Sequence, residues 1–233
     1  MFERGVGSTR VEPELSYQFI ELINHRTDRL AVVRFCISVA VGITPVLKWI
    51  YASHVGRVFA AMNIFFLSLD PAEAARLHCD KHVVKMIVET AQLLYTAHWV
   101  YGSPLPTGAY RKTHPNHPSS RWIRESLVNY TWLCRLGMAL CAEYTHRYGK
   151  IHKTQTHLEW LTTHSPVGLV DVGWTLPRLA MPDEFKDNDP VLAYRKYYVG
   201  AKSRLLVYTK RLSPSFLTQM IYMTAGGKSI PVR

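Results

Sequence analysis

One long amphipathic segment, residues 70–101, constrains the fold of this chain more than any other feature. It opens with Asp70 and Pro71, which are typical of a helix N-cap and first helical position, and Glu73 stands at capping-box spacing. Gly102 and Pro104 supply a stop signal. Apolar residues recur at the 3–4 spacing of a buried helix face: Leu77, Val84, Ile87, Ala91 and Leu94. The pattern predicts a single helix over 70–101 with one face in the core.

A second line of side chains follows the same predicted helix. Its members recur at spacings of 4-3-4-3-4 and therefore share one face: His78, His82, Lys85, Glu89, Gln92 and Thr96. A polar stripe opposite an apolar one is also what an ordinary solvated helix presents. Exposed faces favour Glu, Lys and Arg over His, Gln and Thr, however, so this composition indicates a candidate site that faces a cleft.

The rest of the chain predicts a mainly α fold, a compact helical bundle with long irregular loops. A second helix is expected over 119–148, with Gly149 at its end, and shorter ones over 154–161, 189–208 and 214–223. Residues 164–190 carry four prolines and predict a long irregular connection. Strand signals are sparse, and residues 63–67 are expected to be extended. We therefore expect a helical domain over 62–212 and a basic C-terminal tail over 213–233, disordered at its end.

Residues 1–61 differ from the rest and predict a poorly specified N-terminal extension outside the functional domain. Their uncharged, mainly apolar run, residues 35–47, has 13 residues and contains Pro45. It is shorter than the roughly 20 residues needed to span a bilayer, and it lies too far from the start for an ordinary signal peptide. A membrane anchor is the competing interpretation, but no stable membrane association is expected. Met62 is an attractive alternative start.

Charge and cysteine content narrow the class of partner and the compartment. The 233 residues include 28 Lys or Arg and 17 Asp or Glu, so the formal charge is +11. That excess indicates an anionic partner, either nucleic acid or an acidic membrane surface. The four cysteines (Cys36, Cys79, Cys134 and Cys141) form no CxxC pair. We expect reduced thiols and an intracellular protein, without a disulfide framework or a cysteine zinc site.

Basic residues gather in three places and are interleaved with aromatic ones near the C-terminus, as in proteins that bind phosphate backbones and unstacked bases. The alternatives are loop capping, complementation of a helix dipole, or a basic surface over core tyrosines. With Lys81, the candidate nucleic-acid-binding residues are Asn116, His117, Arg121, Arg124, Arg147, Lys150, Lys153, Arg195, Lys196 and Lys202.

The polar line also contains groups that can carry chemistry. Lys85 and Glu89 stand four residues apart and can pair, and a lysine among histidines and carboxylates can act as a nucleophilic amine. His78, Asp80 and His82 could instead serve a metal-dependent hydrolase, although the glutamate of an HExxH motif is missing. We expect no metal and no cofactor.

Several motifs together resemble a known family. These are a D-K-x-x-x-K-x-x-x-E-x-x-Q helix (Asp80, Lys81, Lys85, Glu89 and Gln92), an N-H-P loop at 116–118, a tryptophan-bearing helix and an acidic, aromatic and basic helix end. Over residues 62–153 the chain resembles the phage-type pyrimidine dimer DNA glycosylases of the endonuclease V type. The resemblance implies a compact α-helical enzyme that cuts the glycosidic bond of a damaged pyrimidine in double-stranded DNA. It also implies a Schiff base with the sugar before strand cleavage, which is a lyase step.

The resemblance also implies roles for particular residues. The family's nucleophile is an N-terminal α-amine, which here would be that of Asn63, freed if synthesis starts at Met62 and the methionine is removed. With residues 1–61 attached, that nitrogen is an amide. Glu89 or Asp80 would be the catalytic carboxylate and Lys85 a second candidate amine, while His82 and His117 would position phosphate or base. A nucleic-acid-binding protein without activity is the alternative, and the lesion and the oligomeric state stay open.

Overall fold

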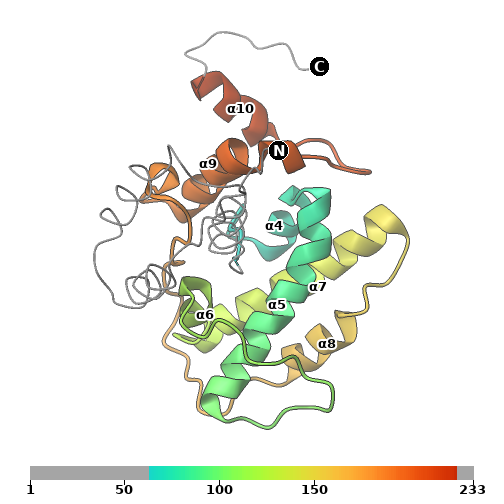
Figure 1. The fold of residues 1–233 in the computed structure, drawn as a ribbon, viewed down its shortest axis with the longest axis vertical. Coiled ribbons are helices and arrows are strands. Elements are labelled where there is room, and N and C mark those ends of the chain that lie inside the picture. Colours follow the sequence, from blue (N-terminus) through green and yellow to red (C-terminus); the bar gives the residue numbers. More distant parts are fainter. Residues whose placement is uncertain (1–62, 225–233) are drawn as a thin grey trace, which may run out of the picture. The chain divides into compact units, whose positions relative to one another are not determined.

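The computed structural model describes residues 63–224, and side chains as far as Met220. These residues are helical and contain no strand, which confirms the mainly α prediction (Figure 1). They belong to one compact unit of the chain, residues 61–233. The extension, the membrane anchor and the start at Met62 are predictions that lie outside the described residues, as does the disordered end beyond residue 224. The helices in chain order are α4 (Pro71–Leu77), α5 (Asp80–Tyr101), α6 (Pro118–Trp122), α7 (Leu127–Tyr148), α8 (Gln155–Thr163), α9 (Pro190–Lys202) and α10 (Ser215–Thr224).

The single helix predicted over 70–101 is in fact two helices, α4 and α5. Asp70 caps α4 as expected, accepting a hydrogen bond of 2.6 Å from the Glu73 amide. The chain then becomes extended at His78 and Cys79. Two amide groups at the break donate to distant parts of the chain, Cys79 N to the Tyr198 hydroxyl (3.2 Å) and Asp80 N to the Val207 carbonyl (2.8 Å). The break therefore has a tertiary cause, and it removes His78 from the polar line on α5.

The helix predicted over 119–148 is also divided, into α6 and α7. The backbone amide of Leu127 donates to the Val170 carbonyl at 2.9 Å, and the Ser126 hydroxyl caps α7 by accepting from Val128 N. Both divisions thus occur where a remote segment supplies the hydrogen bond that a continuous helix would otherwise make internally.

Helices α5 and α7 form the centre of the bundle, with α4 packed on α7 and α8 packed on both. Gly137 of α7 allows this close approach, because a Cβ atom there would lie 2.9 Å from side-chain atoms of Leu158 on α8 and Thr90 on α5. Most of the apolar face predicted for α5 is buried, but Val84, at the margin of that face, is 40% exposed.

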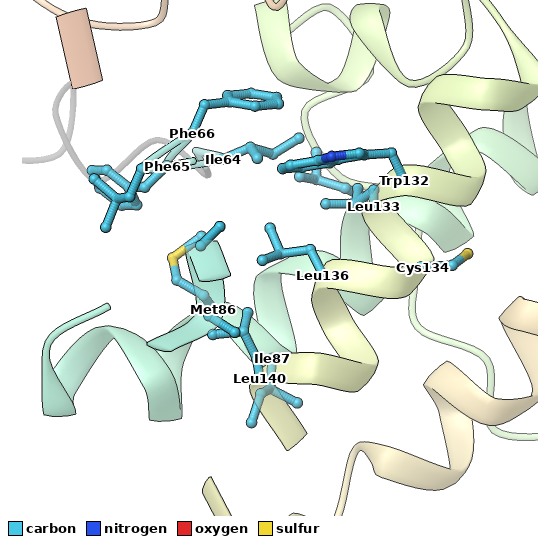
Figure 2. Packing of buried hydrophobic residues seen from close by; sticks show 14 of the residues in the cluster. Ile64, Phe65, Phe66, Met86, Ile87, Trp132, Leu133, Cys134, Leu136 and Leu140 are labelled. Carbon is cyan, nitrogen blue, oxygen red and sulfur yellow. The ribbon is translucent and has the colours of Figure 1, made fainter. Parts of the chain in front are cut away.

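An irregular segment, residues 64–67, lies in the core beside these helices. All four of its side chains are buried. Figure 2 shows Ile64, Phe65 and Phe66 facing side chains of α5 and α7, among them Met86 and Trp132. Phe66 stacks on Trp132 with ring centroids 4.7 Å apart. The sequence predicted an extended segment here, whereas the structure has an irregular one that bends at Leu67, whose amide donates to the Phe65 carbonyl at 3.0 Å. Burial of the segment fixes the position of the residue before it, Asn63.

The C-terminal part of the described chain packs on that segment. The connection over 164–189 is irregular, apart from a short 3-10 turn at Asp183–Phe185. Asp189 caps α9, which ends at Lys202 and not near residue 208. α9 places Tyr198 against Phe65, with centroids 5.2 Å apart, and α10 packs on α9. Within the described residues, the cysteines are free thiols and no helix is long and apolar enough to cross a membrane.

Candidate active site

The centre of the candidate site is a contact between Asn63 and Glu89. The backbone nitrogen of Asn63 lies 3.4 Å from Oε2 of Glu89, and Nζ of Lys85 lies 2.8 Å from Oε1 of the same carboxylate. Glu89 is 7% exposed, whereas 58% of the Lys85 side chain is exposed. Two nitrogen atoms from different parts of the chain therefore meet on one carboxylate at the edge of the core.

The side-chain amide of Asn63 is held by groups from several elements. Its Nδ2 donates to the carbonyl of Ala180 at 2.8 Å. Its Oδ1 accepts from the backbone amide of Ile64 at 2.8 Å, and lies 3.1 Å from the Tyr194 hydroxyl and 3.4 Å from the Ser119 hydroxyl. Both ends of the amide are therefore occupied, and the residue has little freedom to turn.

His82 lies on the same face of α5, two turns before Glu89, but it is buried. Its ring stacks on Phe65 at 4.5 Å, and its Nδ1 lies 2.6 Å from the Tyr198 hydroxyl. Burial lowers the pKa of His82 to about 3, and the charges of Lys202 and Lys85 act in the same direction. His82 is therefore neutral at pH 7 and lies beneath the site as a packed side chain.

The metal site considered for His78, Asp80 and His82 is not formed. Nδ1 of His78 lies 2.6 Å from the Ala74 carbonyl, and Asp80 pairs with Arg147. Among residues 63–224, no group of three His, Cys, Asp or Glu side chains could hold a metal ion. The hypothesis of a metal-dependent hydrolase built on these three residues is therefore wrong.

Asp80 is separated from Glu89, because nine residues along a helix correspond to a rise of roughly 13 Å and a half turn. One of its oxygens accepts from Arg147 Nη1 at 2.8 Å and the other from the Thr209 hydroxyl at 2.7 Å. Hydrogen bonds from Thr209 and Arg147 lower the pKa of the Asp80 carboxyl, although desolvation by burial, the largest single effect, acts against them. Of the two carboxylates considered for catalysis, only Glu89 lies beside Asn63.

Arg147 also departs from the sequence prediction. Its guanidinium is buried and donates to Asp80, to Glu143 (2.7 Å) and to the Arg76 carbonyl (3.1 Å). Because all three guanidinium nitrogens have partners inside the protein, Arg147 is not available to a phosphate, and its assignment to the nucleic-acid-binding set was wrong.

The Asn-His-Pro loop lies beside the polar line, as the interpretation of a shared site requires. Thr96, two turns beyond Glu89, exchanges hydrogen bonds of 3.1 Å with the backbone oxygen and nitrogen of Thr113. The Pro115 carbonyl accepts from Arg124, and His117 accepts from the Ser119 amide at α6. His114 adopts a left-handed backbone conformation with a φ of 45°, which is uncommon for a residue other than glycine. The loop is therefore fixed next to α5.

The remaining candidate nucleic-acid-binding residues stay predictions, and most reach solvent. Arg195 donates to the Leu67 carbonyl at 2.9 Å and Lys196 pairs with Asp187 at 2.6 Å, while Lys202 lies 4.9 Å from the centre of the Tyr197 ring. His117 and Arg124 are half-buried. The exposed members are Lys81, Asn116, Arg121, Lys150 and Lys153.

Three residues at the site were not among the candidates from the sequence. They are Ser119, Ala180 and Tyr194, and all contact the side chain of Asn63. Ser119 directly follows the Asn-His-Pro motif, so its position in the sequence could have marked it as a candidate site residue. Ala180 and Tyr194 stand 117 and 131 residues from Asn63, and no local pattern connects residues so far apart.

No curated protein and no solved structure matches the chain. Residues 62–157 match the family described as pyrimidine dimer DNA glycosylase. The matched segment contains Asn63, Lys85, Glu89 and the Asn-His-Pro loop. Through this segment, which is 96 of the 233 residues, the chain is similar to the pyrimidine dimer DNA glycosylase family.

Proposed function

We propose that this protein excises pyrimidine dimers from double-stranded DNA inside the cell, through a covalent intermediate formed by the nitrogen of residue 63. Glu89 is the catalytic carboxylate in this proposal. The supporting observation is the 3.4 Å contact between the Asn63 nitrogen and Glu89 Oε2 in a largely buried setting. A nucleophilic amine next to a carboxylate that can take its proton is the arrangement that covalent catalysis requires.

The proposed reaction balances with these two groups. The amine attacks C1′ of the damaged nucleotide while the C1′–N1 bond breaks, and the base leaves with the electron pair and takes up a proton. Glu89 accepts a proton from the attacking amine, and its negative charge stabilises positive charge that develops on the sugar. Loss of the C1′–O4′ bond, with protonation of the ring oxygen, gives the Schiff base. Loss of a proton from C2′ then forms a C2′–C3′ double bond, the C3′–O3′ bond breaks, and the 3′ phosphate leaves with the electron pair, which cleaves the strand.

The surroundings of Glu89 suit a DNA strand. Lys85 reaches solvent directly above the carboxylate, and Lys202 is close enough to affect the pKa of His82 beneath it. Asn116 in the fixed loop and Arg121 in the last turn of α6 are exposed to solvent. Exposed cations such as Lys85 beside the buried carboxylate would bind phosphates while the damaged nucleotide turns out of the stack, at a cost of a few kcal/mol.

The proposal requires a free amine at residue 63. Where a residue precedes Asn63, its nitrogen belongs to a peptide bond and cannot attack a sugar. Lys85 offers a second amine on the same carboxylate, at 2.8 Å. We assign the reaction to position 63, because burial and four contacts to the side chain hold it in place, whereas Lys85 is largely exposed.

The test uses one protein before and after a single cut. A protease recognition sequence is placed immediately before Asn63 in the full chain, so that cleavage leaves Asn63 as a new N-terminus. Borohydride is then added with duplex DNA containing a cyclobutane pyrimidine dimer. We expect a covalent adduct only after cleavage, and mass spectrometry should locate it at residue 63. An adduct on Lys85 in the uncut chain would assign the chemistry to the lysine instead.

A nucleic-acid-binding protein without activity is the second candidate, because the Asn63 nitrogen of the 233-residue chain is an amide. Binding would then fall steeply with salt, yet neither the cut nor the uncut chain would form an adduct. That pair of results would contradict the proposed enzyme and leave the DNA-binding function.

A further inference from the structure

We propose that Ala180 and Tyr194 are positioning residues, which hold the side chain of Asn63 and so direct its nitrogen at Glu89. Both lie outside residues 62–157, the part of the chain that matches the family. The inference rests on the proposed function and adds to it a part of the site that the family match does not include.

A residue at a chain terminus needs such support. Terminal residues are poorly ordered unless they are tied down, and a misplaced nucleophile loses most of the advantage of proximity. Burial of residues 64–67 fixes the chain after Asn63. The 2.8 Å hydrogen bond from Ile64 N to Oδ1 couples the side chain to the backbone. The remaining freedom of Asn63 is a rotation of its side chain together with its Cα atom. That rotation moves the backbone nitrogen of Asn63.

Ala180 and Tyr194 oppose this rotation from two directions. The Ala180 carbonyl can only accept, so it receives the Nδ2 hydrogen and fixes which end of the amide faces it. Oδ1 then lies 3.1 Å from the Tyr194 hydroxyl. An amide can satisfy both partners at once, whereas a carboxylate at position 63 would face the Ala180 carbonyl without a hydrogen to donate.

Tyr194 is well suited to this role. It is fully buried, and burial raises the pKa of its hydroxyl, which therefore stays protonated and can donate at any pH where the protein is folded. The hydroxyl also lies 3.3 Å from the Arg178 carbonyl and 3.4 Å from the Ala180 amide. One side chain of α9 thus links the 178–180 backbone to Asn63.

The expected effect of Tyr194→Phe is on the rate of the covalent step and not on DNA binding. The substitution removes one oxygen atom and keeps the ring in the core. Loss of one buried hydrogen bond corresponds to about a tenfold change. In the cut chain, we expect the single-turnover rate of adduct formation at saturating dimer-containing DNA to fall about tenfold, with the Kd for that DNA unchanged.

Tyr208→Phe is the matched control. It removes the same atom from a half-buried tyrosine whose hydroxyl donates to the Leu77 carbonyl at 3.3 Å, away from Asn63. A similar loss of thermal stability with a normal rate is expected. If both variants slowed the reaction equally, the effect of Tyr194→Phe would be general destabilisation and the inference would be wrong.

A double-mutant cycle tests the route through Asn63 directly. Asn63→Gly leaves the amine but removes the side chain that Tyr194 holds, so Tyr194→Phe should add nothing to its defect. Additive defects would overturn the inference. If the cut parent chain forms no adduct, the proposed function and this inference both fail. An active parent with an unaffected Tyr194→Phe variant contradicts the inference alone.

Discussion

Two carboxylate clusters on α5 differ in how completely they are paired. At the start of the helix, Asp80 joins Arg147, Glu143 and Arg211 in a network in which Glu143 accepts from both arginines at 2.7–2.9 Å. In the middle of the helix, Glu89 has one exposed lysine and one long contact of 3.4 Å to a backbone nitrogen. In both clusters an acidic side chain pairs with a basic one, and the carboxylates themselves are largely shielded from water.

The difference separates a structural carboxylate from one with capacity for chemistry. Hydrogen bonds from Arg211 and Arg147 hold the pKa of Glu143 below its usual value, although desolvation by burial, the largest single effect, acts against them. These groups connect α4, α5 and α7 with residues 209–211, and a reaction there would break the fold. Glu89 can change its partners without disturbing the helices. The number of hydrogen bonds and ion pairs that a carboxylate already makes, more than its burial, therefore indicates whether it can take part in a reaction.

Glu89→Gln is expected to have the largest effect. A normal rate in this variant would contradict the distinction drawn between the two carboxylate clusters. In the cut chain, the substitution should lower the rate of adduct formation by about 10³-fold, because the proton acceptor and the negative charge are lost. Binding of the same DNA should be retained. Asp80→Asn is the matched control on the same helix, and it should lower the free energy of unfolding by about 1–2 kcal/mol with a normal rate per folded molecule.

Arg147→Met should have the largest effect on stability. It leaves Asp80 and Glu143 without their shared partner, and removing one member of a buried ion pair costs about 3–5 kcal/mol. Urea unfolding monitored by circular dichroism measures the loss. A change below about 1 kcal/mol would show that the network is not the structural cluster described above.

Acidification should destabilise the fold through one histidine near each cluster. Burial lowers the pKa of His78 to about 4, with Arg147 lowering it further and the Ala74 carbonyl and Glu143 opposing, and it lowers that of His82 to about 3 beside Lys202, Lys85 and His78. Both bind a proton near pH 6.5 when unfolded. Stability is therefore present above pH 6.5 and is lost as the pH falls towards the folded values.

Between pH 7 and pH 5.5 the loss amounts to about 1.2 kcal/mol for each histidine, or about 2.5 kcal/mol together. Urea unfolding at the two pH values measures it. His82→Gln, which can still hydrogen-bond to Tyr198, should reduce the difference by about half. An unchanged pH dependence in this variant would show that His82 is not held neutral.

The smallest effect is expected for Lys85→Met. Because 58% of the lysine side chain is exposed, the loss of its pair with Glu89 should change the free energy of unfolding by about 1 kcal/mol or less. Adduct formation at residue 63 should persist in the cut chain. Complete loss of the adduct would instead show that Lys85, and not residue 63, supplies the reacting amine.

The sequence predicted those parts of the fold that depend on neighbouring residues. Asp70, Gly149 and Asp189 mark helix ends through local hydrogen bonds or glycine geometry, and these ends are where they were expected. The breaks before α5 and α7 were missed, because their amides bond to Val207 and Val170.

The candidate site follows the same rule. The line containing Lys85 and Glu89 was readable from helical spacing, and Thr96 does connect it to the Asn-His-Pro loop. The choice between Asp80 and Glu89 required knowing where Thr209 and Asn63 lie, and the contribution of Tyr194 required contact across 131 residues. Residue spacing along one helix could be interpreted from the sequence, whereas contacts with remote segments could not be predicted from it.

A substitution at Gly137 offers a way to shift the position of Glu89 without changing Glu89 itself. A methyl group at this position would press on Leu158 of α8 and on Thr90, the immediate neighbour of Glu89 in α5. Interiors are close-packed, so the added volume would be passed on as a small displacement and not absorbed. Alanine at position 137 would therefore adjust the spacing between helices from behind the carboxylate, without altering any group that meets the DNA.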